Sequence, residues 1–169
     1  MAEIISGKFV STEVRKSITE QVKEFVATTG VTPGLAVILV GNNPASAVYV
    51  RNKHKACLEV GITSYQIELP EETTEEELLL KIKELNKDKN VHGILVQLPL
   101  PKHINEDKII NAIDPAKDVD AFHPANVGKI MIGKYDFLPC TPAGIMELLH
   151  FYNIDVSGRA ASLSAEAIS

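Results

Sequence analysis

The sequence has few of the residues on which disulfide-rich, metal-binding and aromatic-rich proteins depend. It contains no tryptophan, 5% aromatic residues and two cysteines, Cys57 and Cys140, in 169 residues. Two cysteines do not make a disulfide framework, so a reducing cytoplasm is the expected compartment. The five histidines show no CxxC or HExxH type of spacing. We therefore expect no bound metal.

Basic charge and long apolar runs are scarce too. The formal net charge is −5 and no basic patch dominates, which argues against a nucleic-acid partner. Gly, Gln or Pro breaks the longest apolar runs, so no transmembrane helix is expected. The start, Met1 to Lys8, has no basic region followed by an apolar one and predicts no signal peptide. The remaining composition, 45% hydrophobic and 23% charged, is typical of a soluble globular domain.

Strand-like and helix-like patterns alternate along the chain. Apolar runs and alternations bounded by turn residues predict strands at 33–41, 62–69 and 92–98. Helical periodicity and capping signals predict helices at 11–29, 44–60, 73–85, 105–113 and 141–152, the third opened by a capping box at 73–76. A long polar loop is expected at 116–126. This alternation predicts an α/β fold, a three-layer domain with a mostly parallel sheet flanked by helices.

The helix expected at 44–60 carries the best candidate for acid–base chemistry. Asn43 suits its N-cap, Pro44 its first position and Gly61 its stop. One face then holds Ser46, Tyr49, Val50, Lys53, Ala56, Cys57 and Val60. A lysine on such a stripe loses solvation, which lowers the pKa of its ammonium toward neutral pH. The alternative is that Lys53 lies at the stripe's edge and extends its amine into water.

Ligands of parallel α/β sheets bind at the carboxyl ends of the strands. Three segments meet that description: the turn that ends the first strand, the end of the third strand with Gln97, and the loop that contains Asp120. Separately, Gln97 could be a strand end bonded to water and Asp120 a loop cap. A catalytic centre would form if Lys53, Gln97 and Asp120 pointed into one cleft, but spacing alone does not bring them together.

The same segments resemble a known family. Residues 40–57 (VGNNPASAVYVRNKHKAC) and 93–101 (GILVQLPLP) are similar to signatures of the bifunctional methylenetetrahydrofolate dehydrogenase/methenyltetrahydrofolate cyclohydrolases. Residues 117–122 (KDVDAF) and 139–144 (PCTPAG) match two further motifs of that family. The resemblance covers about residues 1–158, which we expect to be the catalytic domain. It implies NADP-linked one-carbon folate metabolism, with a role in purine biosynthesis, in a cytoplasmic homodimer.

The resemblance also implies roles for individual residues. Lys53 would be the general acid/base of the cyclohydrolase step, and Gln97 would hydrogen-bond it. Asp120 would bind the polar edge of the pterin ring. Tyr49 would stack on the folate, Leu98 and Pro99 would line its slot, and Thr141 and Pro142 would lie near the floor of the cleft. Cys57 is expected to be a small buried hydrophobe.

The tail departs from the family. Relatives continue into a Rossmann domain with a Gly-Arg-Ser-x-Ile-Val-Gly turn, whereas no glycine follows Gly158 here. One permitted back-translation of residues 162–169, shifted by two bases, encodes Val-Ile-Gly-Arg-Ser-Asn-Ile-Val. Residues 159–169 could therefore be a frameshift product that truncates the enzyme before its NADP-binding domain. The chain could also be a naturally short protein or a fragment cut from a longer one.

Without that domain, dehydrogenase activity is expected to be lost and only the cyclohydrolase step to survive. Two alternatives stay open from the sequence. The chain could be an inactive folate-binding or unstable remnant, or an unrelated α/β nucleotide-binding or interaction module.

Overall fold

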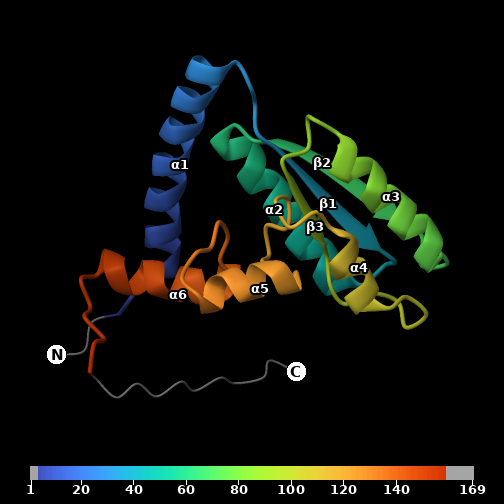
Figure 1. The fold of residues 1–169 in the computed structure, drawn as a ribbon. Coiled ribbons are helices and arrows are strands. Elements are labelled where there is room, and N and C mark those ends of the chain that lie inside the picture. Colours follow the sequence, from blue (N-terminus) through green and yellow to red (C-terminus); the bar gives the residue numbers. More distant parts are fainter. Residues whose placement is uncertain (1–3, 159–169) are drawn as a thin grey trace.

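The computed structural model describes residues 4–158 (Figure 1). The predicted tail, 159–169, lies outside the described residues. The elements follow the order α1 (Gly7–Thr29), β1 (Gly34–Val40), α2 (Pro44–Val60), β2 (Thr63–Leu69), α3 (Glu75–Lys87), β3 (Gly93–Val96), α4 (Glu106–Ala112), α5 (Pro124–Met131) and α6 (Cys140–Phe151). None of the described helices is long and apolar enough to cross a membrane.

The described strands form one sheet in the order β2-β1-β3, and both pairings are parallel. The register places Leu35 of β1 between Ser64 of β2 and Gly93 of β3. Each consecutive pair of strands is joined through a helix, as parallel pairing requires. The predicted α/β class and parallel sheet are confirmed, and the carboxyl ends of β1 and β3 are neighbours.

Three layers follow from the period-two alternation of β1. Ala36, Ile38 and Val40 point to one face, where they pack with Leu78 and Ile82 of α3. On the other face, Val37 and Leu39 pack with Val50 of α2. Figure 1 shows α2 and α3 on opposite sides of the sheet. The helix that carries Lys53 is therefore held against the sheet by a dry apolar contact.

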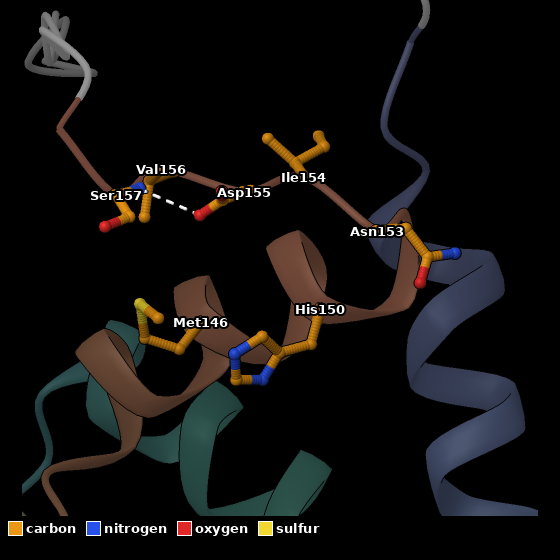
Figure 2. Close-up of a pocket in the computed structure, with 7 residues that line it drawn as sticks. All are labelled: Met146, His150, Asn153, Ile154, Asp155, Val156 and Ser157. Atoms are coloured by element: carbon orange, nitrogen blue, oxygen red, sulfur yellow. Dashed lines mark hydrogen bonds between the residues drawn. The ribbon is translucent and has the colours of Figure 1, made fainter.

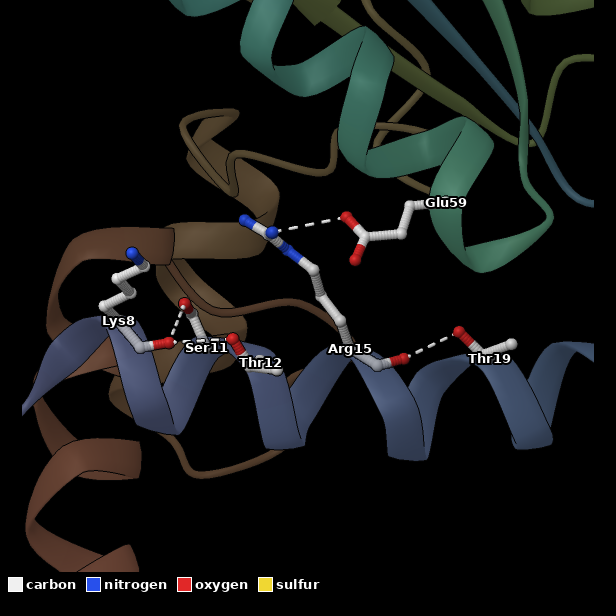
Figure 3. Close-up of polar contacts among 6 residues, drawn as sticks. All are labelled: Lys8, Ser11, Thr12, Arg15, Thr19 and Glu59. Carbon is white, nitrogen blue, oxygen red and sulfur yellow. Dashed lines mark hydrogen bonds and ion pairs between the residues drawn. The ribbon is translucent and has the colours of Figure 1, made fainter.

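Helices α1 and α6 pack outside α2 and hold each other. The rings of Phe9 and Phe151 meet edge to face with centroids 5.7 Å apart. The backbone N–H of Ser6 donates to the hydroxyl of Tyr152 at 3.1 Å. Arg15 of α1 pairs with Glu59 of α2 at 3.3 Å (Figure 3). The contacts of Phe151 and Tyr152 fix the end of α6 against the start of α1.

Helix starts were the least accurate part of the sequence prediction. Helix α1 begins at Gly7, four residues before the predicted Ser11, because Ser6 caps it by accepting from the N–H of Phe9. The capping box of α3 pairs Thr74 with Glu77, one residue later than predicted.

Two further boundaries were also wrong. Strand β3 ends at Val96 rather than residue 98. The N–H of Gln97 still donates to the carbonyl of Ile38 at 2.9 Å, but Pro99, two residues on, has no N–H to continue the ladder. Helix α5, with Pro124 at its first position, was not predicted and takes up the end of the expected loop at 116–126.

Candidate functional site

The local sequence of α2 places Lys53 as expected. The side chain of Asn43 accepts from the N–H of Ser46 at 3.1 Å, and Gly61 ends the helix with a φ of 87°. Ser46, Val50, Cys57 and Val60 of the predicted face are buried, and Lys53 between them is half-buried. Lys53 is thus partly desolvated and its amine lies at the border between core and solvent.

Lys53 and Gln97 meet at the end of β3. The ammonium of Lys53 donates from Nζ to Oε1 of Gln97 at 3.1 Å. Gln97 in turn donates from Nε2 to the carbonyl of Leu98 at 2.8 Å. Because the amide nitrogen is already used, its oxygen faces the amine. Gln97 therefore holds Nζ at the strand end rather than bonding to water alone.

Asp120 faces the same cluster. Burial raises the pKa of its carboxyl, while the positive charge of Lys53 lowers it and the negative charge of Asp118 raises it. Oδ1 of Asp120 also lies 4.0 Å from Sγ of Cys140, the first residue of α6. Four segments of the chain thus contribute an amine, an amide, a carboxylate and a thiol to one cluster.

The loop that carries Asp120 is held by its three preceding residues. Lys117 donates from Nζ to the carbonyls of Leu85 and Asp88 at 2.9 and 2.8 Å, so it caps the end of α3. The carbonyl of Lys117 accepts from the N–H of Ile94 at 2.7 Å, which attaches the loop to β3.

The next residue, Asp118, is buried. Its Oδ2 accepts from the N–H of His123 at 2.8 Å and from Asn126 at 2.9 Å, fixing the start of α5. Val119 packs on the α2 face of the sheet. A Cβ on Gly93 would lie 2.6 Å from its Cγ1, so the close approach of the loop requires glycine there. Asp120, the last residue of this loop, lies near enough to Lys53 for their charges to interact.

The remaining predicted residues lie beside this cluster along the chain. Tyr49, one turn before Lys53, has 63% of its surface exposed. After Gln97, Leu98 is half-buried and Pro99 exposed, and Leu98–Pro99 is a cis peptide bond. Thr141 and Pro142 are exposed in the first turn of α6. The sequence predictions gave Cys140 no role. The available signal was its position in the motif at 139–144, directly before the helix predicted at 141–152.

Two hollows flank these elements. One, of about 340 Å³, opens at the carboxyl ends of the strands and is lined by Gly41, Asn43, Glu71, Pro99 and their neighbours. The other, of about 490 Å³, lies at the far end of α6 between His150 and the segment 153–157 (Figure 2). The first hollow shares the strand-end segments with the Lys53 cluster, since its lining includes Pro99, two residues after Gln97.

A parallel α/β domain with a lysine, amide and carboxylate cluster at its strand ends belongs to the class of ligand-binding domains equipped for acid–base chemistry. A family model described as tetrahydrofolate dehydrogenase/cyclohydrolase, catalytic domain, matches residues 5–120. The chain belongs to this family, which confirms the resemblance and excludes an unrelated α/β module.

Known relatives agree in sequence and in structure. The bifunctional protein FolD of Acetivibrio thermocellus is 58% identical over 158 residues, which are 94% of this chain and 55% of that protein. The solved FolD of Campylobacter jejuni is 50% identical with a TM-score of 0.88, covering 92% of this chain and 55% of that one. A dehydrogenase from the silkworm Bombyx mori is 41% identical with a TM-score of 0.91, over 94% and 55% of the two chains. The chain thus spans about half the length of these relatives.

One solved relative, a dehydrogenase-cyclohydrolase of Trypanosoma brucei, is described as complexed with NADP cofactor and inhibitor. It is 36% identical with a TM-score of 0.88, and the match covers 93% of this chain and 54% of that one. At the described helix starts of this chain, capping side chains or acidic residues compete with the pyrophosphate of such a cofactor. In each helix that follows a strand, a side-chain oxygen occupies a first-turn N–H: Asn43 for α2, Thr74 for α3 and Asn105 for α4. Helices α3 and α4 also begin with acidic residues, which repel phosphate.

Proposed function

We propose that residues 1–158 form a folate-binding catalytic domain that hydrolyses methenyltetrahydrofolate, with Lys53 as the general acid/base. The contact between Nζ of Lys53 and Oε1 of Gln97, opposite the carboxylate of Asp120, carries the proposal. Membership of the dehydrogenase/cyclohydrolase family supports the substrate class.

Hydrolysis needs one group that both accepts and returns a proton. The methenyl carbon, bound to two nitrogens and positively charged, is attacked by water. In its neutral amine form, Lys53 takes a proton from the water as the new C–O bond forms and delivers that proton to the nitrogen as the C–N bond breaks. The hydroxyl of the intermediate loses its proton to solvent as the C=O bond of the formyl group forms. The product carries a formyl group on the other nitrogen, and one proton is released overall. Gln97 keeps the amine at the reacting carbon throughout.

The neighbouring side chains suit the recognition of a flat polar ring. Asp120 accepts from the amino and ring N–H groups of the pterin. Tyr49, exposed one turn before Lys53, stacks on the ligand, and Leu98 and Pro99 line the slot. Thr141 and Pro142 form the adjacent wall at the start of α6.

A methenyltetrahydrofolate hydrolysis assay on the wild-type chain and Lys53→Met tests this function. We expect the rate of Lys53→Met to fall to the uncatalysed background, since loss of a general acid/base costs about 10²- to 10⁴-fold. Lys55→Met is the matched control, because Lys55 lies on the exposed face of the same helix. If wild type, Lys53→Met and Lys55→Met all match the background, the inactive folate-binding remnant is the better description.

Hydride transfer is not part of the proposed activity. Oxidation of methylenetetrahydrofolate needs a nicotinamide held against the folate carbon, and capping side chains or acidic residues at the described helix starts compete with its pyrophosphate. We expect no reduction of NADP when the chain is mixed with methylenetetrahydrofolate, measured by absorbance. Reduction at a rate dependent on chain concentration would contradict this expectation.

A further inference from the structure

Cys140 lies at the Lys53 cluster, and the proton transfers above give it no role. Its Sγ is 4.0 Å from Oδ1 of Asp120, although twenty residues separate the two along the chain. Cys140 is held there by its position as the first residue of α6, whose other end is fixed against α1. Of the two thiols, Cys57 is buried in α2, while Cys140 is exposed.

We propose that Cys140 is a positioning residue: its thiol donates to Oδ1 of Asp120 and sets the orientation of the carboxylate that binds the pterin. The inference rests on the proposed function, because it assigns Asp120 its binding role there. A carboxylate has two oxygens and about four acceptor positions. With Oδ1 held by the thiol, Oδ2 is turned toward the N–H groups of the ligand.

The surrounding charges keep the thiol of Cys140 protonated, so that it can donate to Asp120. Burial and the negative charge of Asp120 raise the pKa of the Cys140 thiol, while Lys53 lowers it. Near neutral pH the sulfur therefore carries its proton and can donate. The titratable groups that face Asp120 are Lys53 on α2, Asp118 in its own loop and Cys140 on α6.

A thiol is a weak donor, so the effect is orientation rather than strong binding. Misorientation of a binding carboxylate weakens substrate capture and leaves the proton transfer at Lys53 intact. We therefore expect Cys140→Ala to raise KM about three- to tenfold and to keep kcat within about twofold of wild type. Cys140→Ser keeps a donor at this position and is expected to restore KM to within about twofold of wild type.

The pH profile separates orientation from packing. Loss of a donor to the charged carboxylate raises the pKa of Asp120, so the acidic limb of kcat/KM should move to higher pH in Cys140→Ala and stay in place in Cys140→Ser. Glu147→Ala is the control, since Glu147 is exposed on the same helix. It should leave KM and the profile unchanged.

Each result decides the inference. A wild-type KM together with an unshifted acidic limb of kcat/KM in Cys140→Ala would overturn it. Equal increases of KM in Cys140→Ala and Cys140→Ser would also overturn it, because Cys140 would then act through packing. If the wild-type chain does not hydrolyse, calorimetric Kd values for folic acid take the place of KM. Equal Kd values in wild type and Cys140→Ala then overturn the inference alone, whereas absence of wild-type binding overturns the proposed function as well.

Discussion

The rate at which iodoacetamide labels Cys140 reports the charges of the cluster without any substrate. Only the thiolate reacts, so the rate follows the thiol pKa. The charge of Asp120 raises that pKa and the charge of Lys53 lowers it. At about pH 8, below the thiol pKa, Asp120→Asn should therefore speed labelling and Lys53→Met should slow it.

The separation of 4.0 Å between Sγ and Oδ1 sets the size of the effect. Two unit charges at about 4 Å interact by about 1 kcal/mol in water, and the exposure of Cys140 makes this limit the appropriate one. That free energy changes the thiolate population about fivefold. Because thiolate nucleophilicity falls with pKa, with a Brønsted slope of about 0.4–0.5, Asp120→Asn should label about two- to threefold faster.

Mass spectrometry resolves the two cysteine-containing peptides in one time course. Buried Cys57 is the internal reference and should label slowly in every variant. Lys55→Met removes the same charge as Lys53→Met from the exposed face of α2 and should leave the rate unchanged. Equal rates for wild type and Asp120→Asn, or faster labelling of Lys53→Met, would refute the placement of the three charges.

Three further predictions concern stability, measured by urea denaturation. Burial raises the pKa of Asp120, so its negative charge disfavours the folded state. Asp120→Asn should therefore increase the free energy of unfolding by up to about 1 kcal/mol at about pH 7. This gain should vanish below about pH 4, where Asp120 is protonated in both the folded and the unfolded state. Gly93→Ala should cost about 1–3 kcal/mol because its Cβ would meet Val119 Cγ1 at 2.6 Å, and adding Val119→Ala should recover part of the loss. Lys117→Met should cost about 1–2 kcal/mol through the lost cap of α3, whereas exposed Lys89→Met should cost nothing measurable.

Local signals were sufficient where each one acts on its own segment. Asn43, Pro44 and Gly61 define α2 without help from the rest of the chain, and the structure keeps those bounds. Helix α5 shows the opposite case. Its start at Pro124 is held by Asp118, which binds the N–H of His123 from outside the helix. The local signals of this start were Pro124 at the first position and His123, whose ring accepts from the N–H of Ala125, a less common cap than the Asn43 of α2.

The site could be predicted as candidates but not as contacts. Helical spacing placed Lys53 among the inward positions of α2, and in the structure it is half-buried between Val50 and Cys57. Its bond to Gln97 joins residues 44 positions apart and exists because β3 lies beside β1 in the sheet. Strand order depends on packing across the whole domain, which periodicity does not report.

The loop from Lys117 to Asp120 shows why a matching motif indicates fold more directly than chemistry. Lys117 caps α3, Asp118 anchors α5 and Val119 packs on the sheet, so three of its four positions serve the architecture. Two aspartates two residues apart have opposite fates: Asp118 is buried among donors, while half-buried Asp120 faces an amine and a thiol. Under the proposed function, ligand binding therefore depends on how firmly the neighbours of Asp120 hold its carboxylate near Lys53. A change at Gly93 or Cys140 should then alter ligand binding although neither residue transfers a proton.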